Sequence, residues 1–572
     1  MVQHPILMSL FALALLLPVM YRRHSRRTGS TPASFSSRKG RVIVLAMASV
    51  VVLAVLSGLA LAKDGDRDGS KTGTDVTNVL PEDTPFEEEV PKLGEAVEKN
   101  RVAINMTWLI VGGILVLFMQ AGFALVETGF TRAKNAAHTM MMNLVIFALG
   151  VVGWFICGYA LMFGATDYSS IIGLTPLGSA FSIGGWNLIA HDGFFLMGKA
   201  YDVSVLGFFF FQMVFMDATA TIPTGALAER WKFSSFIVWG LFVSMLLYPI
   251  FGNWVWGGGW LSQIGAQGPK FGHGFVDFAG SSVVHAMGGI AAFWGAKILG
   301  PRIGKFRSDG TPNAIPGHHI PMAILGTFVL LVGWMGFNGA STFAATDLRF
   351  TVVIVNTILA SAFGCLSCMF IMWKVFGKPD PSMTANGLLA GLVAITAPCA
   401  FVAPWAAAVI GTIAGGLVVA AVLIVERRFK VDDPVGAVAV HGANGIWGVL
   451  ALGLFADGSY GAGLNGVEGT VTGLFYGDAG QLFAQITGAV TVLIFCTLMS
   501  TAFFSILKRT IGMRVPEEAE ISGLDMPEMG AMAYPDFLEA QGSVFVPVEE
   551  VDITEGNGKV TAKGLREEVG SN

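Results

Sequence analysis

The sequence has little charge for its length. Only 13% of its 572 residues are Asp, Glu, Lys or Arg, about half of the roughly 25% that soluble globular proteins carry. The small net charge of −5 gives no reason to expect nucleic acid as a partner. Hydrophobic residues make up 53% of the chain, and many stand in runs of about 20, the length that a helix needs to cross a bilayer. These values exclude an ordinary soluble domain and predict an all-α polytopic membrane protein.

Cysteine is also scarce. The five cysteines all lie inside apolar runs, and Cys365 and Cys368 alone have the CxxC spacing of redox and zinc motifs. No histidine or second cysteine pair lies near them, so we interpret them as small packing residues. We expect no metal site, no cofactor and no catalytic residue, and the protein is not predicted to be an enzyme.

Residues 1–62 are typical of a targeting region. A basic stretch leads into an apolar run over residues 42–62 that ends in Ala-Leu-Ala, as in a cleaved signal peptide. The same run is long enough to be an additional transmembrane helix, and both interpretations stay open. Residues 1–37 have no clear assignment, with Met20 as an alternative start. Residues 63–104 are polar and acidic and predict a mobile linker outside the membrane.

Eleven apolar segments follow and predict a membrane domain over residues 105–508. Basic residues favour one set of alternating loops, sixteen against three, which places the N-terminus outside and the C-terminus in the cytoplasm of a cell membrane. Residues 509–572 are then a cytoplasmic tail. The predicted spans are about 106–128, 139–164, 203–224, 233–252, 280–299, 320–338, 351–374, 385–400, 403–425, 436–455 and 482–507.

Two segments of the membrane domain resemble each other. One runs from Asp277 to Gly289 and the other from Asp433 to Gly445, with Asp, Gly, Val, His and the final Gly at identical offsets. In the predicted topology the first helix starts from outside and the second from the cytoplasm. A motif that enters from opposite faces indicates an inverted repeat of five plus five spans, with one helix left over, and such repeats place the substrate path at their interface.

Each repeat carries a histidine, His285 in the first and His441 in the second. Eight residues of helix rise about 12 Å, so both histidines should lie near the middle of a core roughly 30 Å thick. Ionisable residues at that depth usually face the protein interior and serve a function. A lone histidine would more simply bond a neighbouring helix, but a matched pair predicts a functional site. Use of the pair as metal ligands lacks carboxylates or cysteines at suitable spacing.

Several motifs in order along the chain resemble the Amt/Mep/Rh ammonium transporter family, from about residue 106 to 536. No single motif suffices, but together they form a specific match. The motifs are Gly225-Ala-Leu-Ala-Glu-Arg230, Val255-Trp-Gly-Gly-Gly259, Asp277-Phe-Ala-Gly280, Gly333-Trp-Met-Gly-Phe-Asn338, Asp432-Asp-Pro434 and Val440-His-Gly442.

The resemblance implies a role for several residues by position. Phe215, Trp256 and Ser341 match the outer site that recruits ammonium, and Phe215 and Phe337 match the stacked rings that close the pore below it. Aromatic faces attract cations by about 0.5–2 kcal/mol, and a hydroxyl oxygen accepts an N–H. These residue types therefore suit a small cation that carries hydrogen-bond donors.

His285 and His441 match the family's twin histidines, and Asp277 matches an acidic residue that supports the outer mouth without touching substrate. Ammonium can shed its proton whereas a metal ion of similar size cannot, so a dry pore that passes ammonia rejects metal ions by their solvation cost. The histidines would line this pore, and they could carry the proton separately. Whether the net species is ammonium or ammonia stays open.

The resemblance also implies a homotrimer in the lipid bilayer, with one pore in each subunit and ammonium or ammonia as the transported species. The tail up to about residue 537 resembles the family's cytoplasmic tail, which implies a PII-type regulatory protein as a partner. A rival function is an ammonium sensor that signals through this tail. Two acidic residues have no family role, and for both Asp217 in the third span and Glu127, near Arg132, a structural role is favoured.

Overall fold

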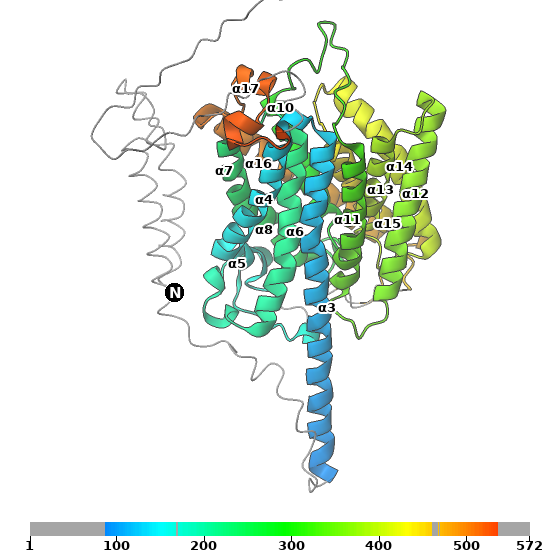
Figure 1. Ribbon diagram of the computed structural model, residues 1–572. Coiled ribbons are helices and arrows are strands. Elements are labelled where there is room, and N and C mark those ends of the chain that lie inside the picture. Colours follow the sequence, from blue (N-terminus) through cyan, green and yellow to red (C-terminus); the bar gives the residue numbers. More distant parts are fainter. Residues whose placement is uncertain (1–85, 167–169, 460–466, 468, 536–572) are drawn as a thin grey trace, which may run out of the picture. The chain divides into compact units, whose positions relative to one another are not determined.

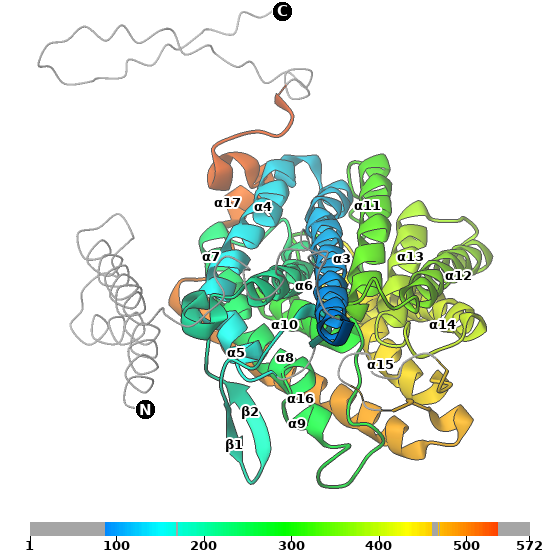
Figure 2. The ribbon, with the colours of Figure 1, turned by 90° about the horizontal axis from the view of Figure 1, so that it is seen from below.

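The computed structural model describes residues 86–166, 170–459, 467 and 469–535. The predicted targeting region and the first part of the linker lie outside the described residues, as does the end of the tail. The body is a bundle of long helices (Figure 1). A hairpin of β1 (Ala180–Ile183) and β2 (Trp186–Ala190) lies at one end of the bundle (Figure 2), and the short helix α17 (Glu517–Ser522) lies at the other. These two ends are called the hairpin face and the tail face.

Each of the eleven predicted spans coincides with helical structure. Ten helical segments of the described chain are long and apolar enough to cross a membrane, and the eighth span, α13, is shorter at 15 residues. The spans are α3 (Phe86–Phe130); α4 (Ala136–Gly153), η2 (Trp154–Gly158) and α5 (Tyr159–Phe163); α6 (Val203–Leu227); α7 (Phe233–Phe242), η6 (Val243–Leu247) and α8 (Tyr248–Trp256); η7 (Ser281–Ala286) and α10 (Met287–Leu299); α11 (Ile320–Gly339); α12 (Phe350–Phe376); α13 (Pro381–Ile395); α14 (Pro404–Leu423) and η9 (Ile424–Arg428); η10 (Val438–Ala443) and α15 (Asn444–Phe455); and α16 (Ala479–Thr510).

Short helical turns lie in the connections between the spans and, in the case of η13, in the tail. They are η1 (Ala133–Asn135), η3 (Ser170–Ile172), η4 (Phe194–Leu196), η5 (Gly198–Ala200), α9 (Trp260–Gln263), η8 (Ala340–Thr342), η12 (Leu474–Tyr476) and η13 (Asp525–Met529).

The first span begins earlier than the sequence predicted. Helix α3 starts at Phe86 and projects beyond the hairpin face (Figure 1), so the last part of the predicted mobile linker is helical. Ion pairs between Glu95 and Lys99, four residues apart, and between Glu98 and Arg101, three apart, lie along this extension. Such pairs stabilise a helix in water. The low hydrophobicity that predicted a linker therefore did not exclude a helix.

The outer surface of the bundle suits a lipid environment. Large apolar side chains of α12 and α16, including Phe363, Phe370, Leu493 and Leu498, are exposed. A soluble monomer rarely exposes apolar side chains in such numbers on adjoining turns. The exposed apolar surface and the helix lengths together indicate a multi-pass membrane protein.

The first helix of each repeat packs against the other through glycine. A Cβ added to Gly326 of α11 would lie 2.7 Å from the Gly122 carbonyl oxygen of α3, and one added to Gly336 would lie 2.7 Å from the Gly112 carbonyl oxygen. Neither distance leaves room for a side chain. Glycine at these positions lets α3 and α11 approach closely, which is how helices associate in lipid.

A buried ionic cluster closes the tail face of the bundle. The Arg302 guanidinium donates to both carboxylate oxygens of Asp432, at 2.8 and 2.9 Å, and to Glu229 at 2.9 Å. Arg230 donates to the Asp432 backbone oxygen at 2.7 Å. Burial alone would raise the pKa of the Asp432 carboxyl, but the Arg230 and Arg302 charges outweigh burial and hold that pKa well below its ordinary value. Two of the family motifs thus meet in one cluster.

The start of the tail packs on the tail face of its own chain. Glu520 accepts hydrogen bonds from the Arg514 guanidinium, at 2.9 and 3.0 Å, and from the Ile303 backbone N–H at 2.7 Å. Asp525 accepts from two backbone N–H groups in the first turn of α4, at 3.0 and 3.1 Å. An acidic side chain at a helix N-terminus satisfies unpaired N–H groups there, so Asp525 fixes the tail to α4.

Candidate functional site

The two matched segments begin their helices in the same way. Asp277 accepts hydrogen bonds from three backbone N–H groups that follow it, at 2.7–3.0 Å, and Asp433 accepts from three at 2.8–3.3 Å. Three residues after each aspartate stand Gly280 and Gly436, with φ of 115° and 81°, which favour glycine. Burial raises the pKa of both carboxyls, although these hydrogen bonds oppose it. Both aspartates are therefore caps for the helices that carry the histidines.

His285 and His441 lie in six-residue π-helical turns, η7 and η10, and such turns are frequent at functional sites. The two helices cross directly beyond them. A Cβ added to Gly289 would lie 2.1 Å from a backbone nitrogen of η10, and one added to Gly445 would lie 2.4 Å from a backbone oxygen of η7. The final glycine of each matched segment thus lets the backbones meet, and the crossing brings the two histidines together.

The paired imidazoles share one hydrogen bond. Nδ1 of His285 and Nδ1 of His441 are 3.2 Å apart, and the rings lie 25° from parallel. Only one proton fits between the two nitrogens, so in the neutral pair one ring is protonated on Nδ1 and the other on Nε2. Both side chains are buried, and Nε2 of His285 has no hydrogen-bond partner among the described residues. The pair therefore offers one donor and one acceptor. These roles are exchanged when the shared proton moves to the other ring while the first ring gains a proton on Nε2 and the second loses one from Nε2.

A column of aromatic rings leads from the histidines toward the hairpin face. The ring centroid of Phe337 in α11 lies 5.5 Å from that of His285, and Phe215 of α6 stacks on Phe337 at 4.0 Å. Trp256, at the end of α8, meets Phe215 edge-on at 6.2 Å. Residues from four spans thus form one continuous series of ring contacts.

Ser341 and Asp277 support the hairpin end of this column. The Ser341 hydroxyl donates to the Phe337 backbone oxygen at 2.7 Å, so its own oxygen lone pairs stay available to accept a hydrogen bond. The indole N–H of Trp256 donates to the Asp277 backbone oxygen at 2.6 Å. Asp277 therefore positions both Trp256 and the start of η7, and its carboxylate is already occupied by its own helix.

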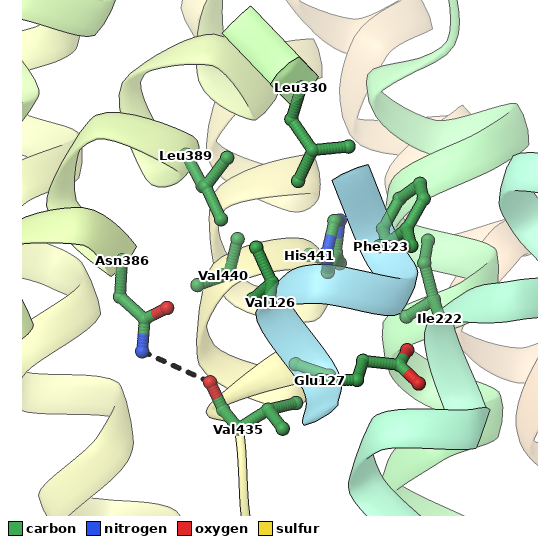
Figure 3. A pocket seen from close by; sticks show the side chains of 11 residues that line it. Phe123, Val126, Glu127, Ile222, Leu330, Asn386, Leu389, Val435, Val440 and His441 are labelled. Carbon is green, nitrogen blue, oxygen red and sulfur yellow. Dashed lines mark hydrogen bonds between the residues drawn. The ribbon is translucent and has the colours of Figure 1, made fainter. Parts of the chain in front are cut away.

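A cavity extends from His441 toward the end of α3 that bears Glu127. Figure 3 shows the side chains that line it. Most of its lining is apolar, with polar groups at a few points. The lining residues are Phe123, Val126, Glu127, Ile222, Leu330, Asn386, Leu389, Val435, Ala437, Val440 and His441. The column of rings and this cavity meet at the histidine pair.

Trp334 belongs to the site although the sequence analysis gave it no role. Its indole stacks on His285 with centroids 4.9 Å apart and planes 21° from parallel, and its N–H donates to the Thr396 hydroxyl at 2.9 Å. It stands in the motif from Gly333 to Asn338, so the signal was present in the sequence. Its contact with His285, however, depends on how α11 packs against η7.

The two unexplained acidic residues are both buried. Glu127 does not pair with Arg132, which contacts Glu229 instead. The Glu127 carboxylate forms hydrogen bonds with the side chains of Asn143 and Thr224. Asp217 lies in α6 with one carboxylate oxygen unpartnered among the described residues, and it does not line the cavity. Glu127 and Arg132 are near each other in the sequence, but they bind different partners.

Comparison with known proteins identifies the chain. A model of the Ammonium Transporter Family matches residues 107–534. The chain belongs to the ammonium transporter family. The ammonium transporter Amt2 of Archaeoglobus fulgidus is 47% identical over 456 residues, which cover 78% of this chain and 92% of that protein. Ammonium transport across a membrane is accordingly the general function of this family member.

Solved structures of the family have the same fold. A structure described as a sensor Amt protein is 36% identical, with a TM-score of 0.65, and the match covers 76% of this chain and all of that one. The crystal structure of Saccharomyces cerevisiae Mep2 is 26% identical, with a TM-score of 0.63, over 73% of this chain and 88% of that one. The resemblance stated from the sequence motifs is therefore confirmed.

Proposed function

We propose that the transporter recruits ammonium at the hairpin end of the aromatic column. Trp256 and Phe215 offer ring faces, which attract a cation, and the Ser341 oxygen can accept one N–H. The observation that carries this proposal is the proximity of these residues. Trp256 contacts Phe215 edge-on, and the Ser341 hydroxyl donates to the backbone oxygen of Phe337, whose ring stacks on Phe215. Asp277 supports the site through its backbone bond to Trp256 and does not touch the ion.

Ammonium then gives up its proton, which the outward imidazole of the histidine pair receives, and ammonia passes the rings of Phe215 and Phe337, which act as a gate. The rings stack at 4.0 Å, so one of them must turn aside before a molecule passes. Below the gate the path is apolar apart from the imidazoles of His285 and His441. A neutral molecule that both donates and accepts hydrogen bonds suits a pair that offers one donor and one acceptor.

The proton follows through the histidine pair and does not cross with the ammonia. A proton added to the outward imidazole makes it a donor on both nitrogens, and the shared Nδ1 hydrogen then moves to the partner ring. The second ring releases the proton on the far side. Ammonia and a proton thus cross by separate steps, and a metal ion, which has no proton to give up, is excluded.

The hairpin face is the outer face in this proposal and the tail face is cytoplasmic, as the distribution of Lys and Arg indicates. Three copies form a trimer in the cell membrane, with one pore in each. A PII-type regulatory protein would meet the cytoplasmic face beside α17.

An ammonium sensor is the alternative function. It is favoured by the 36% identity to a protein described as a sensor Amt protein, all of which this chain covers. A sensor binds ammonium and signals through the tail but moves little of it. Transport rate therefore separates the two functions.

We expect purified protein in proteoliposomes to give a saturable ammonium-evoked current that potassium does not evoke. The physical reason is that a potassium ion has no proton to release, so it would have to cross the apolar pore as a charged ion. Vesicles without protein are the control. Absence of current together with alkalinisation of the vesicle lumen would indicate an electroneutral ammonia channel, and absence of both would favour the sensor.

Replacement of Trp256 by leucine should weaken the recruitment of ammonium. Loss of a cation–π contact of about 0.5–2 kcal/mol corresponds to a roughly 2- to 30-fold increase in the ammonium concentration that gives half-maximal current. The maximal current should change less, because the histidine pair is intact. A Trp256→Phe variant keeps a ring face and serves as the matched control. Equal half-maximal concentrations in wild type and Trp256→Leu would contradict the assigned role.

A further inference from the structure

Glu127 is a buried carboxyl at the cavity below the histidines, and the transport pathway described so far gives it no task. It lines the same cavity as His441 (Figure 3). Helix α3 connects the positions of Glu127 and His441. The ring centroids of Phe123 in α3 and of His441 are 6.2 Å apart, and Glu127 follows Phe123 by four residues, or about 6 Å of helix rise. Glu127 thus lies one helical turn beyond His441 on the way to the tail face.

In the part of the chain that the structure describes, this carboxyl has no ion pair. Among the described residues, no Lys, Arg or His nitrogen lies within the 4.0 Å of an ion pair from it, and Arg132 is engaged by Glu229. Its partners are neutral: the Asn143 amide N–H donates to it at 2.7 Å, and the Thr224 hydroxyl lies 2.7 and 2.8 Å from its two oxygens. A buried carboxyl that pairs only with neutral groups is expensive to keep ionised.

The hydrogen bonds of Thr224 fit a carboxyl with or without a proton. Its hydroxyl oxygen also lies 2.6 Å from the Thr221 backbone oxygen, yet the hydroxyl has a single hydrogen to donate. If that hydrogen goes to Glu127, the carboxylate is ionised. If it goes to Thr221, Glu127 must donate its own acid proton to the Thr224 oxygen. Rotation of one hydroxyl therefore accommodates both states, with no movement of heavier atoms.

The geometry points to Glu127 as a proton-transfer residue at the cytoplasmic end of the pore. It receives the proton from His441 and returns it to ammonia. In the first step an N–H bond of the imidazolium breaks and the Glu127 O–H bond forms; in the second that O–H bond breaks and an N–H bond of ammonium forms. No electron changes hands, and one ammonium ion leaves for each that entered. This inference rests on the proposed function, since it supplies the step that reunites the two species.

The charged and titratable surroundings agree with a site of variable charge. The Asp433 carboxyl lies just before η10, and His441 faces the same cavity as Glu127. Asn386 of α13, which also lines the cavity, is neutral and donates to the Val435 backbone oxygen at 3.1 Å. A glutamine at position 127 would satisfy Asn143 and Thr224 equally well and would avoid the cost of placing an acidic residue within a membrane helix. The carboxyl therefore has a use beyond packing.

The test is a Glu127→Gln variant in proteoliposomes, compared with wild type for ammonium-evoked current and for alkalinisation of the lumen. Glutamine keeps the shape and the hydrogen bonds but carries no proton. We expect the current to fall at least tenfold while ammonia still enters, so that the lumen becomes more alkaline for each ammonium taken up. Glu127→Asp, which keeps an acid, should conduct more than Glu127→Gln.

Asp217→Asn is the matched control, because it removes a buried carboxyl that does not line the cavity. It should retain the wild-type current to within about twofold. A Glu127→Gln current within twofold of wild type would overturn the assignment. So would loss of both current and ammonia entry, since that pattern indicates a structural role. A wild type without any ammonium current refutes the charged pathway itself, whereas a conducting wild type with an unaffected variant refutes only the role of Glu127.

Discussion

Replacement of both His285 and His441 by leucine is expected to reduce the ammonium-evoked current by at least about a hundredfold. The leucines fill the space, but they remove the hydrogen-bond donor and the hydrogen-bond acceptor that the two imidazoles offer between the gate and the cavity. Passing a polar molecule through a site without hydrogen bonds costs about 2–7 kcal/mol, and roughly 2.7 kcal/mol already corresponds to a hundredfold in rate. The proton also loses its carrier. The measurement is the saturating current per reconstituted protein.

We also expect a large loss of current in each single variant, His285→Leu and His441→Leu. Each leaves a buried imidazole whose Nδ1 has lost its partner at 3.2 Å, so each should lose most of the current alone. His138→Leu is the matched control, because His138 is a buried histidine of α4 whose ring nitrogens have no partner among the described residues. An undiminished current in the double variant, with His138→Leu also active, would rule out the histidine pair as the conducting site.

Replacement of Arg302 by methionine is expected to destabilise the protein by about 3–5 kcal/mol. The change leaves the buried carboxylates of Asp432 and Glu229 without their shared cation, and the loss of one partner of a buried ion pair has costs of this size. Denaturant unfolding in detergent micelles, followed by tryptophan fluorescence, measures the effect. Transport at low temperature should survive in the fraction that remains folded, because the cluster lies away from the aromatic column.

Two further variants test whether the loss of stability comes from the buried carboxylates that Arg302 contacts. Arg302→Met combined with Asp432→Asn should recover part of the lost stability, because the Asp432 side chain that lost its ion-pair partner is then neutral, while Glu229 keeps its ion pair with Arg132. Arg101→Met removes an exposed ion pair with Glu98 and should cost less than about 1 kcal/mol. Equal effects of Arg302→Met and Arg101→Met would show that burial of the cluster contributes nothing.

Local patterns predicted much of the fold and the site. Apolar runs gave each span, since a helix in lipid must be apolar over about 20 residues. The matched offsets of Asp277 and Asp433 predicted two helices that enter from opposite faces, and both aspartates do cap those helices. The final glycines of the two segments were visible as a pattern, but their purpose, a backbone crossing, appears only when η7 and η10 are packed together.

Misses arose where neighbours in space differ from neighbours in sequence. Arg132 stands five residues after Glu127, yet it contacts Glu229 at the end of α6. Trp334 stacks on His285 from another span. The helical start of α3 was missed for a different reason, because polar composition was taken to indicate a linker while ion pairs within the helix support it in water.

The sequence by itself determined the class of protein, the spans, the repeat and the identity of the two histidines, because each of these depends on composition, length or offset along one chain. Tertiary structure alone decided which nitrogens of His285 and His441 meet, which rings form the column, and which neutral groups surround Glu127. These are contacts between different helices, and their distances are set by how closely glycine allows the backbones to approach. A sequence pattern records that glycine is present, whereas only packing shows what it brings into contact.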